Sequence, residues 1–145
     1  MIGIDSGANT VYVTLKEKVT LDSPVYVFVI VNNQTLKKYM VTNTDQSTST
    51  AIRNKFTITQ VSNPTWTSGQ IYLENYGDHT YYAYECADTS ALDYNTVVNA
   101  DINDYIPTYF TTLLETGVLV FNQPAPTNHT YKEVETAGKA YVPSI

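Results

Sequence analysis

The chain has 145 residues, which is enough for one domain with a hydrophobic core but short for two. Its formal net charge of −6 and its isoelectric point of about 4.6 disfavour nucleic acids and anionic membrane surfaces, because both attract proteins with concentrated Lys and Arg. We therefore expect a single domain spanning residues 1–145, with no nucleic-acid partner and no membrane partner.

The composition is typical of β-strands joined by polar loops, with thirteen tyrosines, four phenylalanines and one tryptophan. The one cysteine, Cys86, has no second cysteine in the chain with which to form a disulfide, and we expect it to be a small buried hydrophobe near a strand end. The first residues lack the basic region and the long apolar core of a signal peptide, so synthesis in the cytoplasm is expected.

The first part of the chain predicts an arm followed by a strand. Residues 1–8 are mostly small or polar and contain glycine, which favours an extended N-terminal arm outside the core. Residues 10–15 alternate, with Val11, Val13 and Leu15 on one side, and predict the first strand.

The most apolar stretch is residues 25–31. Seven apolar residues are too few for a transmembrane helix and suit a strand. Valines alternate with Tyr26, Phe28 and Ile30, so both faces of the strand are apolar. Such a strand is expected to be central in its sheet and covered twice, the second cover being an inserted segment or another subunit.

The middle of the chain predicts four more strands. Residues 36–42 are expected to form a more exposed partner strand, and residues 53–60 alternate clearly. Residues 70–76 and 80–86 follow, and the turn residues Gly77 and Asp78 between them predict a hairpin crowded with tyrosines.

Two segments have no strand periodicity. Residues 43–50 are almost wholly Asn, Thr, Asp, Gln and Ser and predict a polar loop. Residues 87–112 form an insertion that is irregular but too apolar to be disordered. We expect this insertion to form short helical turns and to cover Tyr26, Phe28 and Ile30.

The C-terminal part predicts a short helical turn over residues 112–117, stopped by Gly117, and then a strand over residues 118–121. The last strand candidates are residues 131–134 and 140–142, and residues 135–145 are expected to form a C-terminal arm.

Short strands with turns roughly every 8–12 residues are typical of a β-sandwich. The predicted fold class is all-β. The sequence predicts an immunoglobulin-like antiparallel β-sandwich, without the usual cysteine pair and with an irregular or partly helical insertion around residues 87–115.

No motif for catalysis or metal binding is present. His79 and His129 each lie beside turn residues and are expected at the surface, and one Cys with two His does not make a structural zinc spacing. Asp101 and Asp104 bring oxygens close, but without the glycine and the spaced acids of an EF-hand loop. We expect no enzyme, no catalytic residue, no cofactor and no bound metal.

Aromatic side chains are the candidates for an interaction surface, because Tyr and Trp are enriched at protein interfaces. For the tyrosines of the predicted hairpin, cross-strand pairing is favoured over a platform for stacking sugars, and Trp66 is expected to close one end of the sandwich. The interface candidates are Tyr72, Tyr76, Tyr81, Tyr94, Tyr105, Tyr109 and Trp66.

Several short motifs resemble a family of small virion proteins of tailed bacteriophages, in particular those infecting Bacteroidetes hosts. The segment NTVYVTLKEKVTLDSP (residues 9–24), followed by the apolar strand, resembles the start of these proteins. The further motifs are KFTIT (55–59), SGQIYL (68–73), YAYE (82–85) and LETGVLV (114–120). The resemblance implies a non-enzymatic β-sandwich built into the virion, and it carries over no catalytic residue.

The leading hypothesis is therefore a structural protein of a phage particle, located at the capsid surface, the head–tail connector or the tail. Its expected partners are other virion proteins, and it is expected to form a homo-oligomer within the assembly. The alternative is a carbohydrate-binding β-sandwich in which Trp66 and exposed tyrosines stack on sugars and the acidic loop holds Ca²⁺.

Overall fold

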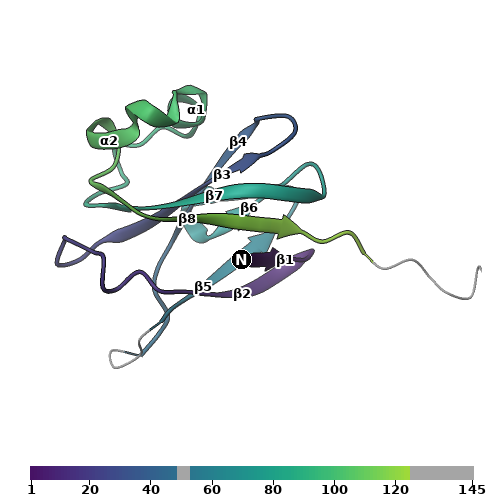
Figure 1. Cartoon of the computed structure of the whole chain (residues 1–145), viewed down its shortest axis with the longest axis horizontal. Coiled ribbons are helices and arrows are strands. Elements are labelled where there is room, and N and C mark those ends of the chain that lie inside the picture. Colours follow the sequence, from purple (N-terminus) through teal and green to yellow (C-terminus); the bar gives the residue numbers. More distant parts are fainter. Residues whose placement is uncertain (49–52, 125–145) are drawn as a thin grey trace, which may run out of the picture.

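The computed structural model describes residues 1–48 and 53–124 and is a mostly β protein with two sheets, one of them a curled mixed half-barrel. A short helical segment around residues 94–108 lies on the side of the larger sheet that faces away from β2 and β5 (Figure 1). The elements are β1 (Ile2–Ile4), β2 (Gly7–Val13), β3 (Val25–Asn32), β4 (Lys38–Asn43), β5 (Asn54–Gln60), η1 (Trp66–Ser68), β6 (Gln70–Ile71), β7 (Gly77–Cys86), α1 (Tyr94–Asn99), η2 (Ile102–Asp104), α2 (Tyr105–Thr108) and β8 (Thr112–Phe121).

The larger sheet has five strands in the order β1-β8-β7-β3-β4, and the smaller sheet has three in the order β2-β5-β6. Most neighbours are antiparallel, but β1 runs parallel to β8 and β6 runs parallel to β5. The expectation of a purely antiparallel sandwich is therefore wrong at two sheet edges. After β1 and after β6 the chain crosses directly to the other sheet. Each of these short strands therefore lies beside a strand with which it forms no hairpin.

β3 is a central strand, as its sequence predicts, and it pairs with β4 on one side and β7 on the other. Its aromatic face points between the two sheets, where the rings of Tyr26 and Phe28 each pack edge-on against Phe56 of β5, with centroids 5.3 Å apart. Large side chains belong on this face because facing sheets lie about 10 Å apart and must fill that space.

The valine face of β3 lies under the helical segment. Val27 and Val29 are fully buried in a second cluster with Val97, Tyr105 and Phe110. The two-sided cover of β3 is therefore confirmed, but the expectation that the insertion covers the aromatic face is wrong. Small valines leave room for an aromatic-rich segment to approach the sheet closely, whereas the aromatic side chains reach the opposite sheet.

We call residues 94–110 the helical cap. Its first helix, α1, is capped by Asp93, whose carboxylate accepts a hydrogen bond from the Thr96 backbone N–H at 3.0 Å. The Tyr105 hydroxyl donates to the Val97 carbonyl at 2.8 Å, and the Phe110 ring stacks on Tyr84 of β7 with centroids 4.6 Å apart. The helical character expected within residues 87–112 is confirmed, and α1, η2 and α2 all lie inside that range.

The N-terminal residues do not form an arm. Ile2 and Ile4 are buried in the core as part of β1, and the Ile4 carbonyl accepts a hydrogen bond from Asn122 N–H at 2.8 Å. The prediction failed because a three-residue strand has too few residues for its alternation to stand out, although Ile2 and Ile4 flank Gly3 with the correct period.

Residues 112–117 are also not a helical turn, because β8 runs from Thr112 to Phe121, with one register shift against β7 at Leu114. Gly117 serves close packing here. A Cβ at this position would lie 2.7 Å from Cε1 of Tyr81, so glycine lets the buried Tyr81 ring cross the strand. The hydroxyl of Tyr81 donates a hydrogen bond to the carboxylate of Glu115 on the same strand.

The tyrosine hairpin predicted over residues 70–86 does not exist. β6 ends at Ile71 because the side-chain amide of Gln60, and not a strand backbone, pairs with both backbone polar groups of Leu73, at 2.9 and 3.1 Å. β6 and β7 consequently belong to different sheets.

The partner strand β4 begins at Lys38 and is mostly buried, so the expectation of a more exposed strand is wrong. The helical cap and η1 contact β4 and cover it. The strand candidates at residues 131–134 and 140–142 and the arm at 135–145 lie outside the described residues. Within the described ranges no helix is long and apolar enough to cross a bilayer.

Replacing Phe110 with alanine tests the helical cap. We expect Phe110→Ala to lower the free energy of unfolding by about 3–5 kcal/mol, because it leaves a cavity between the cap and β7. The matched control is Tyr72→Ala at an exposed aromatic, with a change of about 0.5 kcal/mol or less. Denaturant unfolding measures both, and equal losses would contradict the packing described here.

Candidate functional site

The seven predicted interface aromatics do not form one surface. Tyr81 and Tyr105 are core residues, with 2% and 0% of their surface exposed. Trp66, Tyr94 and Tyr109 are partly buried and pack against the buried cluster between the helical cap and the larger sheet. The ring centroids of Trp66 and Tyr94 lie 6.0 Å apart. Tyr81 and Tyr105 therefore cannot contact a partner.

Tyr72 and Tyr76 are the exposed members of the predicted set, at 43% and 48% of their surface. The Tyr76 ring packs on Phe121 of β8, with centroids 4.6 Å apart, so it is held at the surface by the core. Neither ring packs against Trp66, so the described residues contain no paired stacking platform of the expected kind.

Burial governs the acid–base behaviour of the core tyrosines. Desolvation raises the pKa of Tyr84 to about 12, because the phenolate would lose hydration under the helical cap. Burial also raises the pKa of Tyr81, with a further increase from its hydrogen bond to the Glu115 carboxylate. Both hydroxyls stay protonated near neutral pH, and that of Tyr81 donates its hydrogen bond to Glu115.

One surface that the sequence did not predict is the outer side of the larger sheet, beside the helical cap. Residues that are paired in neighbouring strands share a face of the sheet. The register therefore places alternate side chains of β3, β7 and β8 on this side. We call the part that the cap leaves uncovered the open face. It consists of Val31, Thr80, Thr116, Val118 and Val120, with Tyr82 at its edge, where this ring packs against the buried cluster under the cap.

The open face carries no charged side chain within it. Lys38 and Asp78 lie at its borders, paired with Val31 and Val120 in the strand register. Val118 has 45% of its surface exposed, and Leu113, further along β8 toward the cap, has 41%. This uncharged strand face was missed because residues 112–117 were interpreted as a helical turn, which hid the alternation of β8.

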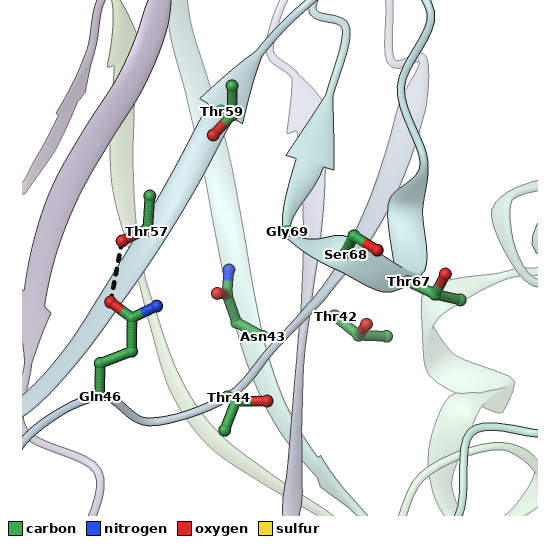
Figure 2. A pocket seen from close by; sticks show the side chains of 9 residues that line it. All are labelled: Thr42, Asn43, Thr44, Gln46, Thr57, Thr59, Thr67, Ser68 and Gly69. Atoms are coloured by element: carbon green, nitrogen blue, oxygen red, sulfur yellow. Dashed lines mark hydrogen bonds between the residues drawn. The ribbon is translucent and has the colours of Figure 1, made fainter.

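A second feature is a polar groove between the end of β4, β5 and η1 (Figure 2). Its volume is about 310 Å³, and its walls come from the end of β4 and the following residues, from β5, and from η1 with its C-cap. We call it the threonine groove. It is lined by Thr42, Asn43, Thr44, Gln46, Thr57, Thr59, Thr67, Ser68 and Gly69.

The threonine groove was missed because residues 43–50 predicted only a loop. The available signal was the alternation of Thr57 and Thr59, which places two hydroxyls on the outer face of one strand. That these hydroxyls meet Asn43 and the η1 turn is a consequence of how the two sheets pack together.

Among residues 1–48 and 53–124, no three His, Cys, Asp or Glu side chains gather around a common point where they could hold a metal ion. The Asp101 carboxylate is used locally and accepts from Asn103 N–H at 2.9 Å. His79 is fully buried, so the expectation of a surface histidine is wrong: alternation along β7 turns it inward with Tyr81. His129 lies outside the described residues, and Cys86 is buried at the end of β7, as expected.

Glu85 is a buried carboxylate that holds the loop before β3. Thr20 donates to it from its backbone N–H, at 3.0 Å to each oxygen, and also from its hydroxyl. Leu21 N–H donates at 3.3 Å. Burial raises the pKa of Glu85, but the hydrogen bonds from Thr20, Thr112 and Leu21 outweigh it and hold the pKa below its usual range.

We expect Glu85→Gln to lower the free energy of unfolding at pH 7 by ~2 kcal/mol, because an amide cannot accept all of these bonds. Since the pKa is lower in the folded state, this contribution is present above the unfolded pKa of about 4.3 and is lost as the pH falls through the folded value. The difference in the free energy of unfolding between the two proteins should therefore narrow as the pH is lowered from 7 through the folded pKa of Glu85. Exposed Glu17→Gln is the control, and a difference that does not change with pH would contradict this role.

No protein-family model matches the chain, and neither a curated protein nor a solved structure matches it.

Proposed function

We propose that the protein is a non-enzymatic structural component of a tailed-phage virion, located at the capsid surface, the head–tail connector or the tail. In this proposal it acts in the virion after synthesis in the host cytoplasm, and its partners are other virion proteins, including further copies of itself. The observation that carries the proposal is the open face, an exposed and uncharged strand surface on an otherwise well-packed domain.

The motifs that resemble phage virion proteins support the proposal through their positions. They fall on β2, β5, the η1–β6 turn, β7 and β8, and the first is followed directly by β3. The helical cap lies between the motifs, in the insertion. A shared sandwich frame with a variable insertion is what divergent members of a structural family are expected to have.

We propose further that the fold is immunoglobulin-like. The order β8-β7-β3-β4 corresponds to strands G, F, C and C′ of that fold, and the pair β2–β5 corresponds to B and E. The parallel strand β6 departs from the pattern, since it follows β5 in the chain whereas strand D precedes strand E. The correspondence rests on strand order and pairing alone.

The open face suits a partner whose contacting surface is also uncharged. Two copies could place these faces together without bringing like charges into contact, because Lys38 and Asp78 remain at the borders. A stable contact buries about 800 Å² per partner, so the interface would extend from the open face onto its surroundings, including Leu113.

Mass spectrometry of purified phage particles that encode this sequence tests the proposal directly. We expect the protein at a constant copy number per particle. Absence from the particles, together with a monomeric purified protein by sedimentation, would reject it.

A charge on the open face should separate assembly from folding. We expect Val118→Lys to change the free energy of unfolding by about 0.5 kcal/mol or less, because Val118 is exposed in the free chain. Self-association or incorporation into particles should fall at least about tenfold, since an unpaired charge is costly to bury. Leu36→Lys, at an exposed apolar residue outside the open face, is the control and should assemble normally. Normal assembly of Val118→Lys would place the interface elsewhere.

A further inference from the structure

We propose that the threonine groove is a binding site for one neutral saccharide unit. This proposal does not depend on the virion assignment, and it uses none of the aromatic residues singled out from the sequence. Figure 2 shows the nine lining residues around a common space between β5 and the η1 turn.

The centre of the groove contains a polar group without a partner. Asn43 is a buried residue with 8% of its surface exposed, and its side-chain nitrogen Nδ2 is enclosed without any hydrogen-bond partner within the described residues. Figure 2 shows this amide pointing toward β5 between Thr57 and Gly69. A buried donor left unpaired costs free energy, so an acceptor from a bound molecule would stabilise this arrangement.

The backbone of β5 adds a second set of polar groups. Lys55 O accepts from Gln46 N at 2.7 Å, and Thr59 N donates to Gly69 O at 2.9 Å, so both residues direct their backbone groups away from β2. By the two-residue period of a strand, Thr57 between them directs its N–H and C=O to the same side. That side is the groove.

These two contacts also limit the length of the groove. Gln46 closes one end, where its side-chain oxygen accepts from the Thr57 hydroxyl at 2.9 Å, and the start of β6 closes the other. Gly69 lines the wall in the left-handed conformation with φ of 74°, and a Cβ there would lie 2.8 Å from Thr57 O and 3.3 Å from Asn43 Oδ1. Glycine therefore keeps the space beside Asn43 open.

The lining determines the chemistry of the ligand. All nine lining residues are uncharged, and eight of them carry a hydroxyl or a carboxamide. The nearby carboxylate of Asp45 is directed elsewhere, to Lys55 N–H at 3.0 Å and Asn54 Nδ2 at 2.8 Å. A metal ion would need ionised oxygens, and an anion would meet a protein of net charge −6 without a lysine or arginine in the groove.

A neutral molecule with several groups that both donate and accept fits this lining, and a sugar ring has such groups around its whole edge. The volume of about 310 Å³ lies at the lower end of small-molecule sites, which run from about 300 Å³. An added peptide strand would need a continuous edge, but Gln46 and β6 interrupt the edge of β5 on both sides of Thr57.

The test is a titration of the ¹⁵N-labelled full chain with glucose, galactose, mannose and N-acetylglucosamine, followed by amide chemical shifts. We expect at least one sugar to cause saturable shifts centred on Thr57, Gly69 and the Asn43 side chain. Glucuronic acid, glucosamine and a neutral extended peptide are the comparison ligands, and each should bind more weakly.

Two variants assign the binding to the groove. Asn43→Ala and Thr59→Val should each weaken binding by about tenfold, roughly the loss of one hydrogen bond. Thr10→Val, on the neighbouring strand outside the lining, is the matched control and should bind like the original protein. Preserved chemical-shift dispersion verifies that each variant is folded.

The proposal is overturned if none of the four sugars gives saturable shifts. It is equally overturned if the shifts persist in both Asn43→Ala and Thr59→Val, or if the peptide binds more tightly than every sugar. None of these results bears on whether the protein is part of a virion, which the particle measurement decides separately.

Discussion

The burial of β3 on both faces is the constraint on which the rest of the structure depends. One face needs large side chains that reach the second sheet, and Tyr26 and Phe28 meet Phe56 there. The other face needs a separate cover, and the helical cap supplies it with Tyr105 and Phe110. Without the cap, the valine face of the central strand would be exposed and would promote aggregation.

The partial extent of this cover creates the two surface features of interest. The cap lies over one end of the outer face and leaves the other end exposed, which is the open face. The threonine groove arises where β4 leaves the larger sheet and the chain turns toward β5. Both features follow from how the insertion and the loops lie on the two sheets, and neither belongs to a single strand.

Buried polar side chains hold the segments that enter or leave the two sheets. Glu85 binds the loop that leads into β3, Asn54 accepts from Leu15 N–H at 2.8 Å, and Gln60 pairs with the backbone of Leu73. In each case a side chain, and not a neighbouring strand, provides the hydrogen-bond partner for the backbone where the chain enters or leaves a sheet. Sequence periodicity gives no information about such contacts, which explains why the strand predicted over residues 70–76 ends early.

Alternation alone was enough to predict β2, β3, β5 and β7 to within a few residues, and with them a mostly β fold and a central strand that needs two covers. It could not predict which face of β3 packs against the second sheet and which lies under the helical cap, because both faces are apolar and neither carries polar residues that would indicate exposure to water. The short parallel strand β1 and the true length of β8 were also decided by tertiary packing, since the close approach of Tyr81 to Gly117 exists only between strands distant in sequence. The amide of Asn43 illustrates the same limit: its place in a polar loop could be predicted from composition, but its burial without a partner beside Thr57 arises only when the two sheets come together.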